Sequence, residues 1–218
     1  MSLNHCIASC SIKRPLVEIC APSVERALEA FARGADRVEL CRDIECGGLT
    51  PTDDDLAAIP FLPGPVHVLI RVRPGDFVYN ADEIQAMLAS IDRAAMSRAA
   101  GVVVGALTAE GKIDIAASKA LIDRAREHGL SVTFHRAIDE AADYFQAYDD
   151  VCSLDVDRIL TSGGMATAYD GRFRLAQLTG TPIIMPGKGI TGENVREIVA
   201  VTGAREVHGT RMEILESL

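Results

Sequence analysis

Two short segments near the beginning of the chain each end in a glutamate and a cysteine that one residue separates. The first ends in Glu18 and Cys20, and the second in Glu39 and Cys41. Both segments have the alternating pattern of a β-strand, in which successive side chains point to opposite faces, so each glutamate shares a face with its cysteine. A strand that only supports the fold rarely has acidic groups on its inner face. These four side chains are therefore candidates for proton transfer or metal binding.

The composition indicates a single globular domain. The 218 residues are 48% hydrophobic and 24% charged, which is enough to bury one large core. We expect a flexible leader over residues 1–15 and one barrel domain over residues 16–218. The net charge of −9 argues against a nucleic-acid partner. No apolar run approaches the roughly 20 residues that a membrane helix needs. These features predict a cytoplasmic protein.

Eight β-rich segments alternate with segments that have the apolar periodicity of amphipathic helices. Strict alternation implies parallel strands, and eight such units predict a small (β/α)8 TIM-type barrel. A doubly wound open sheet is the main alternative. The predicted strands are residues 16–20, 36–41, 66–72, 101–107, 131–137, 158–162, 182–186 and 205–209.

The helical segments have two irregularities. The Asp-rich segment after the second strand predicts a short helix or none. The chain ends at Leu218, soon after the eighth strand, so we expect the barrel to be incomplete at its C-terminal helix. A missing helix would leave apolar surface uncovered. We therefore expect a homo-oligomer in which a partner chain covers this surface.

More polar side chains fall on the inner face of the predicted barrel. Counting every second residue along the strands gives Arg71, Arg73, His135, Glu206 and His208. Catalytic and binding groups of TIM barrels lie at the C-terminal ends of the strands. Burial of so many ionisable groups is costly unless they are paired. They therefore predict a ligand pocket, a layer of internal ion pairs, or both.

Seven motifs, in matching order, resemble those of the CutC copper-homeostasis family. They extend from about Leu16 to His208. The resemblance implies a TIM-type barrel, a Cu(I) site and a cytoplasmic location, without an established reaction. The family's Arg-Pro-Arg-Gly-Gly-Asp-Phe reads Arg-Val-Arg-Pro-Gly-Asp-Phe here. The motifs begin and end at Arg37–Cys41, Gly47–Pro51, Ile70–Arg73, Gly75–Phe77, Thr133–Ala137, Leu160–Gly163 and Ile184–Gly187.

The copper-binding thiols of the family match Cys20 and Cys41, so the resemblance implies that these two residues bind Cu(I). Neighbouring strands lie about 4.8 Å apart, and two thiolates at their ends can converge on one soft ion. The structural alternative is that both are small buried hydrophobic residues. Cys46, in the loop that follows, is a further candidate ligand.

The alternative function is that of a TIM-barrel enzyme acting on a small phosphorylated or carboxylate substrate. Its candidate catalytic residues are Glu18, Glu39, Arg71 and His135. The glutamates would carry protons, the arginine would hold an acidic group, and the histidine would act as a general acid or base. A binding protein with a regulatory ligand in the same pocket is a third interpretation.

The candidate anion site of such an enzyme comprises Arg73 and two glycine-rich turns. Ser162 and Gly163 follow the sixth predicted strand, and Gly187 and Lys188 follow the seventh. Backbone N–H groups of such turns can bind a phosphate or a carboxylate. The structural alternative is that both turns are ordinary loops.

Overall fold

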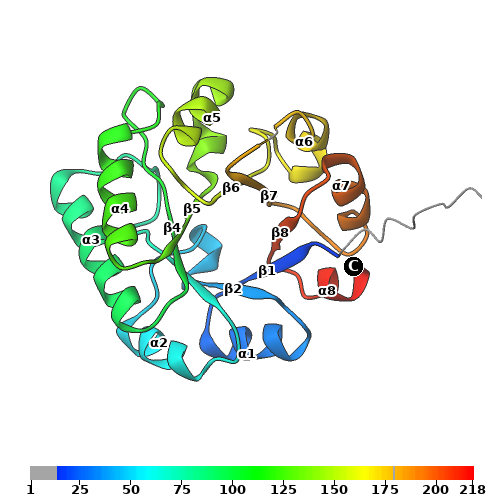
Figure 1. Ribbon diagram of the computed structural model, residues 1–218, viewed down its shortest axis with the longest axis horizontal. Helices are drawn as coiled ribbons and strands as arrows, with labels where there is room; N and C mark the ends of the chain where they lie inside the picture. The colour runs from blue at the N-terminus through cyan, green and yellow to red at the C-terminus, as the bar shows by residue number, and fades with distance from the viewer. Residues whose placement is uncertain (1–13, 179) are drawn as a thin grey trace, which may run out of the picture.

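The computed structural model describes residues 14–178 and 180–218. In this part of the chain, eight parallel strands follow the order β7-β6-β5-β4-β3-β2-β1-β8 and curve into a barrel surrounded by helices (Figure 1). The predicted (β/α)8 TIM-type fold is confirmed. The strands are β1 Leu16–Ala21, β2 Arg37–Leu40, β3 Val66–Leu69, β4 Gly101–Val104, β5 Ser131–Phe134, β6 Arg158–Thr161, β7 Ile183–Pro186 and β8 Glu206–Gly209.

Helical segments separate every pair of successive strands. The α-helices are α1 Val24–Ala32, α2 Asp53–Ala58, α3 Ala81–Met96, α4 Ile115–Glu127, α5 Tyr144–Cys152, α6 Ala168–Leu175, α7 Val195–Thr202 and α8 Glu213–Ser217. Three short 3-10 helices are η1 Ile44–Cys46, η2 Ile59–Phe61 and η3 Arg136–Glu140.

Polar side chains set the helix boundaries. Ser23 accepts a hydrogen bond from the N–H of Arg26 and caps α1, and Asp114 caps α4 in the same way. Thr52 and Asp55 form a reciprocal capping box at the start of α2. This helix has only six residues, in agreement with the expectation from its Asp-rich sequence.

The C-terminal segment corrects one expectation. A helix does follow the last strand, because the short segment after β8 is enough for the five residues of α8. Ile214 on this helix is completely buried and lies directly against Gly209, where a side chain would meet its Cδ1 atom. The predicted leader, residues 1–15, lies outside the described residues except for Arg14 and Pro15.

Side chains alternate along the strands between the helical layer and the barrel interior. In β1, Val17 and Ile19 are fully buried in the main apolar cluster, whereas Glu18 forms ion pairs across the interior. The parallel pairing of β1 with β8 sets Glu18 opposite His208, and its pairing with β2 sets Cys20 opposite Glu39. None of the described helices combines the length and apolar character required of a membrane span.

Candidate functional site

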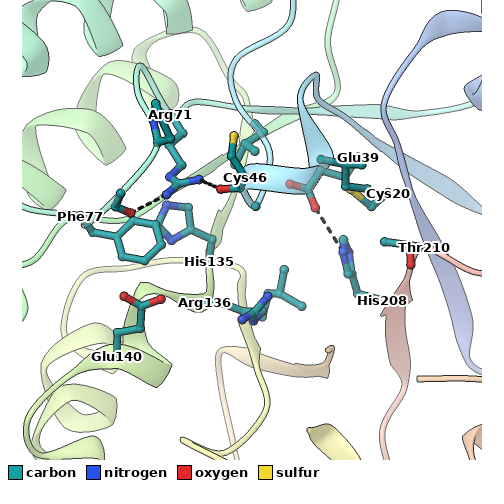
Figure 2. Close-up of a pocket in the computed structure, with 16 residues that line it drawn as sticks. Cys20, Glu39, Cys46, Arg71, Phe77, His135, Arg136, Glu140, His208 and Thr210 are labelled. Atoms are coloured by element: carbon teal, nitrogen blue, oxygen red, sulfur yellow. Dashed lines mark hydrogen bonds and ion pairs between the residues drawn. The ribbon is translucent and has the colours of Figure 1, made fainter. Parts of the chain in front are cut away.

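A cavity of about 550 Å³ opens at the C-terminal ends of the strands. Its walls come from β1, β2, β3, β6 and β8 and from the loops that follow β2, β3, β5 and β8 (Figure 2). The lining residues with titratable side chains are Cys20, Glu39, Cys46, Arg71, His135, Arg136, Glu140 and His208. TIM barrels hold their binding sites at this end, so the cavity is the candidate functional site.

Cys20, which lines the cavity, contacts Cys41, which is not among the described lining residues. Their Sγ atoms are 3.5 Å apart. Cys20 is 8% exposed and lines the cavity, whereas Cys41 is fully buried and clusters with Leu69 and Val103. The hydrogen bond between the two thiols, burial and the negative charge of Glu39 raise the pKa of Cys20. The metal-free protein therefore holds this sulfur as a thiol.

Glu39 and His208 border the thiol pair. One ligand atom from each, and one from Cys20, lie within 4.8 Å of one another. His208 Nε2 is 3.4 Å from Glu39 Oε2, and His208 Nδ1 is 2.8 Å from Glu18 Oε1. Burial opposes the charge of His208, but the hydrogen bond to Glu18 and the charge of Glu39 outweigh it and raise the pKa of His208. Burial raises the pKa of Glu39 to about 7, against the charge of His208.

A layer of ion pairs lies deeper in the barrel. Arg37 pairs with Glu18 and, at 2.5 Å, with Glu206, which also pairs with Arg158 at 2.7 Å. Burial opposes ionisation of Glu18, but the hydrogen bond with His208 and the charge of Arg37 hold the pKa of this carboxyl well below its usual range. The internal ion pairs that were one of the sequence-based expectations are present. Glu18, a candidate catalytic residue, belongs to them.

Most donors of the two candidate anion-binding arginines already have partners, although Nε of Arg71 has none among the described residues. Arg71 is 5% exposed, and its guanidinium donates to three backbone carbonyl oxygens of the surrounding loops at 2.6 to 3.0 Å. Arg73 pairs with Asp76 at 2.9 Å and with Glu83 at 2.5 Å, and it is not among the described residues that line the cavity. Arg71 thus fastens the loops around the cavity, while Arg73 lies outside it.

The turn after β6 holds a carboxylate of the protein itself. Asp139 accepts the backbone N–H groups of Ser162 and Gly164, each at 2.9 Å, and the hydroxyl of Thr161 at 2.6 Å. The N–H of Gly163 donates to the hydroxyl oxygen of Thr161 at 2.9 Å. These N–H and hydroxyl groups are the hydrogen-bond donors that a bound anion would need at the predicted site in this turn. Asp139 was not expected there, because its sequence position lies in a different loop.

The turn after β7 does not reach the cavity. Gly187 donates its N–H to the carbonyl of Thr161 at 3.0 Å. Lys188 is exposed and, like Gly187, is absent from the described cavity lining. His135, by contrast, lines the cavity and is 5% exposed. Burial and the charge of Arg71 lower the pKa of His135 to about 3, so its ring is neutral.

Three polar lining residues were not predicted as site residues: Arg136, Glu140 and Thr210. Arg136 and Thr210 lie just beyond the ends of β5 and β8. Thr210 continues the period-two series of Glu206 and His208, which is the sequence signal that could have identified it, and Arg136 directly follows His135. Cys46, the candidate third thiol, also lines the cavity, but its Sγ donates to the carbonyl of Asp43 at 3.0 Å.

Several known proteins are similar to this chain over most of its length. A protein of Aliivibrio fischeri named as a family protein CutC is 43% identical over 197 residues, which are 88% of this chain and 80% of that protein. A protein of Xanthomonas campestris with the same name is 44% identical over 199 residues, which are 89% of this chain and 82% of that protein.

The solved structures that resemble the chain share its barrel. A CutC crystal structure from Streptococcus agalactiae, whose name assigns it to copper homeostasis, has a TM-score of 0.81 and 31% identity, covering 91% of this chain and 100% of that one. Phosphoribosyl anthranilate isomerase of Thermococcus kodakaraensis has a TM-score of 0.59 at 17% identity, covering 94% and 96%, and shows the fold alone. The sequence model described as the CutC family matches residues 15–213. The chain therefore belongs to the CutC family.

Proposed function

We propose that this protein binds Cu(I) through Cys20 and Cys41 and serves copper homeostasis. The observation that supports the proposal is the contact between the two Sγ atoms, 3.5 Å apart, one of which belongs to a residue that lines the cavity. Thiolates are the soft ligands that Cu(I) prefers. The CutC relative from Streptococcus agalactiae carries copper homeostasis in its name.

The distance between the sulfur atoms favours a third ligand. With a metal–sulfur bond of about 2.3 Å, two sulfurs 3.5 Å apart subtend an angle of about 100° at the ion, well short of a linear arrangement. His208 and Glu39 lie beside Cys20 and offer a nitrogen and an oxygen. We propose that one of them, with His208 the softer donor, completes a three-coordinate site.

Copper binding must displace protons from the thiols. Because the hydrogen bond with Cys41 and burial raise the pKa of Cys20, the affinity for Cu(I) should rise with pH through the neutral range. The site also requires reduced thiols, so the proposed function belongs in a reducing compartment such as the cytoplasm.

An anaerobic titration of the reduced protein with Cu(I), against a competing chelator, tests the proposal. We expect one ion per chain for the wild type and a loss of affinity of at least about a hundredfold in the Cys20→Ser/Cys41→Ser variant, since both soft ligands are removed. The control is Cys152→Ser, which changes a thiol on α5 that is not among the described cavity-lining residues. Equal affinity of this variant and of Cys20→Ser/Cys41→Ser would contradict the proposal.

A second candidate function is catalysis on a small phosphorylated or carboxylate molecule in the same cavity. Glu39 favours it, because burial raises the pKa of this carboxyl to about 7 and thus allows it to gain and lose a proton at neutral pH. Such an enzyme would keep its turnover in Cys20→Ser and lose it in Glu39→Gln. If the protein binds copper through the thiol pair, Cu(I) binding should instead be weakened more by Cys20→Ser than by Glu39→Gln.

A further inference from the structure

The cavity contains a buried hydrogen-bond donor that no described residue uses. Nδ1 of His135 accepts the backbone N–H of Ala137 at 3.2 Å, so the proton of the neutral ring lies on Nε2. Nε2 is buried and has no hydrogen-bond partner among the described residues. Leaving such a donor unpaired costs free energy, so an acceptor atom from a ligand would be well placed here.

The neighbours of His135 hold its ring in one orientation. The ring of Phe77 lies against it with a centroid separation of 4.8 Å. On the other side, Gly105 has no side chain, and a Cβ there would lie 2.6 Å from Nδ1 and Cε1 of the imidazole. The unpaired Nε2–H group is therefore a fixed donor in the cavity wall, where Figure 2 shows the ring between Phe77 and Arg136.

Arg136 supplies positive charge beside this donor. Its one ion pair among the described residues, between Nε and Asp139 Oδ2, is long at 3.6 Å. The carboxylate of Asp139 already accepts hydrogen bonds from Thr161, Ser162 and Gly164. Arg136 Nε has no hydrogen-bond partner among the described residues. The guanidinium is therefore only weakly compensated, and it lines the same cavity as His135.

The remaining walls indicate the chemical class of the ligand. Ile44, Leu69, Phe77 and Leu160 contribute apolar surface, which suits an organic body. Asp139 occupies the glycine-rich turn in which a phosphate would find its N–H donors. Arg71 and Arg136 bring two positive charges to the lining, and Glu140 brings one negative charge, since Glu39 already pairs with His208. Together with the neutral N–H group of His135, this balance matches a single negative charge with two oxygen atoms.

We propose that the cavity binds a small organic carboxylate, whose oxygens accept hydrogen bonds from Nε2 of His135 and from the guanidinium of Arg136. The apolar body of this monoanion lies against Phe77 and Leu160. The proposal goes beyond copper binding and does not rest on it, because neither side chain belongs to the thiol pair.

The test is a nuclear magnetic resonance titration of the full, reduced, copper-free chain with benzoate and with pivalate. We expect saturable binding that shifts the Nε2 resonance of His135, with no comparable binding of benzamide or inorganic phosphate. Arg136→Gln should weaken benzoate binding at least about tenfold, the loss expected for one charge-assisted hydrogen bond. The matched control Arg172→Gln, which removes an arginine paired with Glu197 outside the cavity, should bind benzoate as the wild type does.

A second variant tests the donor itself. Gly105→Ala should displace the ring of His135 and weaken benzoate binding, with folding checked by thermal unfolding. Arg136→Gln should bind Cu(I) as the wild type does, so that a failure of copper binding and a failure of this proposal are distinguishable. Absence of saturable binding, an unchanged affinity in Arg136→Gln, or equal binding of inorganic phosphate would each overturn the proposal.

Discussion

At the scale of single residues, Arg37 supplies positive charge that compensates buried carboxylates inside the barrel. Its side chain is 4% exposed and pairs with Glu18, which has no exposed surface, and with Glu206. A buried charge without a counter-charge costs several kcal/mol, because the solvation that it loses is not replaced. Arg37 therefore compensates two buried carboxylates, to which Arg158 and His208 add one further partner each.

Replacement of Arg37 by leucine should lower the free energy of unfolding by about 3–5 kcal/mol, because both carboxylates would lose their main cation. Denaturation by urea measures this change. Arg26→Leu is the matched control: its pair with Glu29 has side-chain exposures of 38% and 45%, so a change within about 1 kcal/mol is expected. Similar effects of the two substitutions would contradict the role of Arg37.

His67 makes the folded state sensitive to acid. Burial lowers the pKa of His67 to about 4, below its ordinary value of 6.5, so the unfolded chain binds the proton more tightly. Stability therefore falls as the pH drops from 6.5 towards 4, by about 1.4 kcal/mol for each pH unit from this residue. Glu39 acts in the opposite sense, since its pKa is raised to about 7.

Urea denaturation of the wild type and of His67→Gln at a series of pH values isolates this contribution. The slope of the unfolding free energy against pH between about 4.5 and 6 should be smaller in the variant by about 1.4 kcal/mol per unit. A slope that the substitution leaves unchanged would mean that His67 is already protonated in the folded protein.

At the scale of elements, the link between η3 and the turn after β6 shapes one side of the cavity. Asp139 on η3 accepts two backbone N–H groups of this turn and the hydroxyl of Thr161. The side chain of Asp139 is only 4% exposed. The carboxylate thereby occupies the position that a bound anion takes in glycine-rich turns, and it fixes the turn without a ligand.

Removal of this carboxylate in Asp139→Ala should lower the free energy of unfolding by about 1–3 kcal/mol, because buried N–H groups lose their acceptor. Inorganic phosphate should recover part of the loss by binding to the vacated turn, which thermal unfolding with and without phosphate would reveal. Asp143→Ala is the control, since this exposed residue caps α5 and its loss should not respond to phosphate. Equal responses of both variants would refute this account of the turn.

At the scale of the whole molecule, helices of the described residues surround the barrel, and α8 follows its last strand, β8 (Figure 1). α8 is short, but Ile214 has no exposed surface and its neighbour Met212 only 4%. The helix thus contributes to the core. Assembly into a homo-oligomer stays a prediction.

Ile214→Ala should lower the free energy of unfolding by about 2–4 kcal/mol, because it removes a fully buried side chain and leaves a cavity. Ile115→Ala is the matched control: this residue is 41% exposed, so the same change in size should cost much less. Thermal or urea denaturation compares the two. Equal costs would show that α8 detaches from the barrel before global unfolding.

The sequence by itself determined the alternation of strands and helices and several of the residues that face the barrel interior. Alternation with a period of two is a local property of each strand, and it correctly assigned Glu18, Cys20, Glu39, Glu206 and His208 to the inner face. The motifs also identified the family. These conclusions need only neighbouring residues, whose spacing the chain itself specifies.

Only the tertiary structure decided which partner each polar group takes. Arg71 and Arg73 carry the charge of an anion site, yet carbonyl groups and carboxylates of the protein already bind them. The turn at Gly163 has suitable N–H groups, but Asp139 of another loop binds to it. At the cavity, Arg136 has one long ion pair among the described residues, with Asp139. Such pairings depend on distances between segments far apart in the chain, which no local pattern encodes.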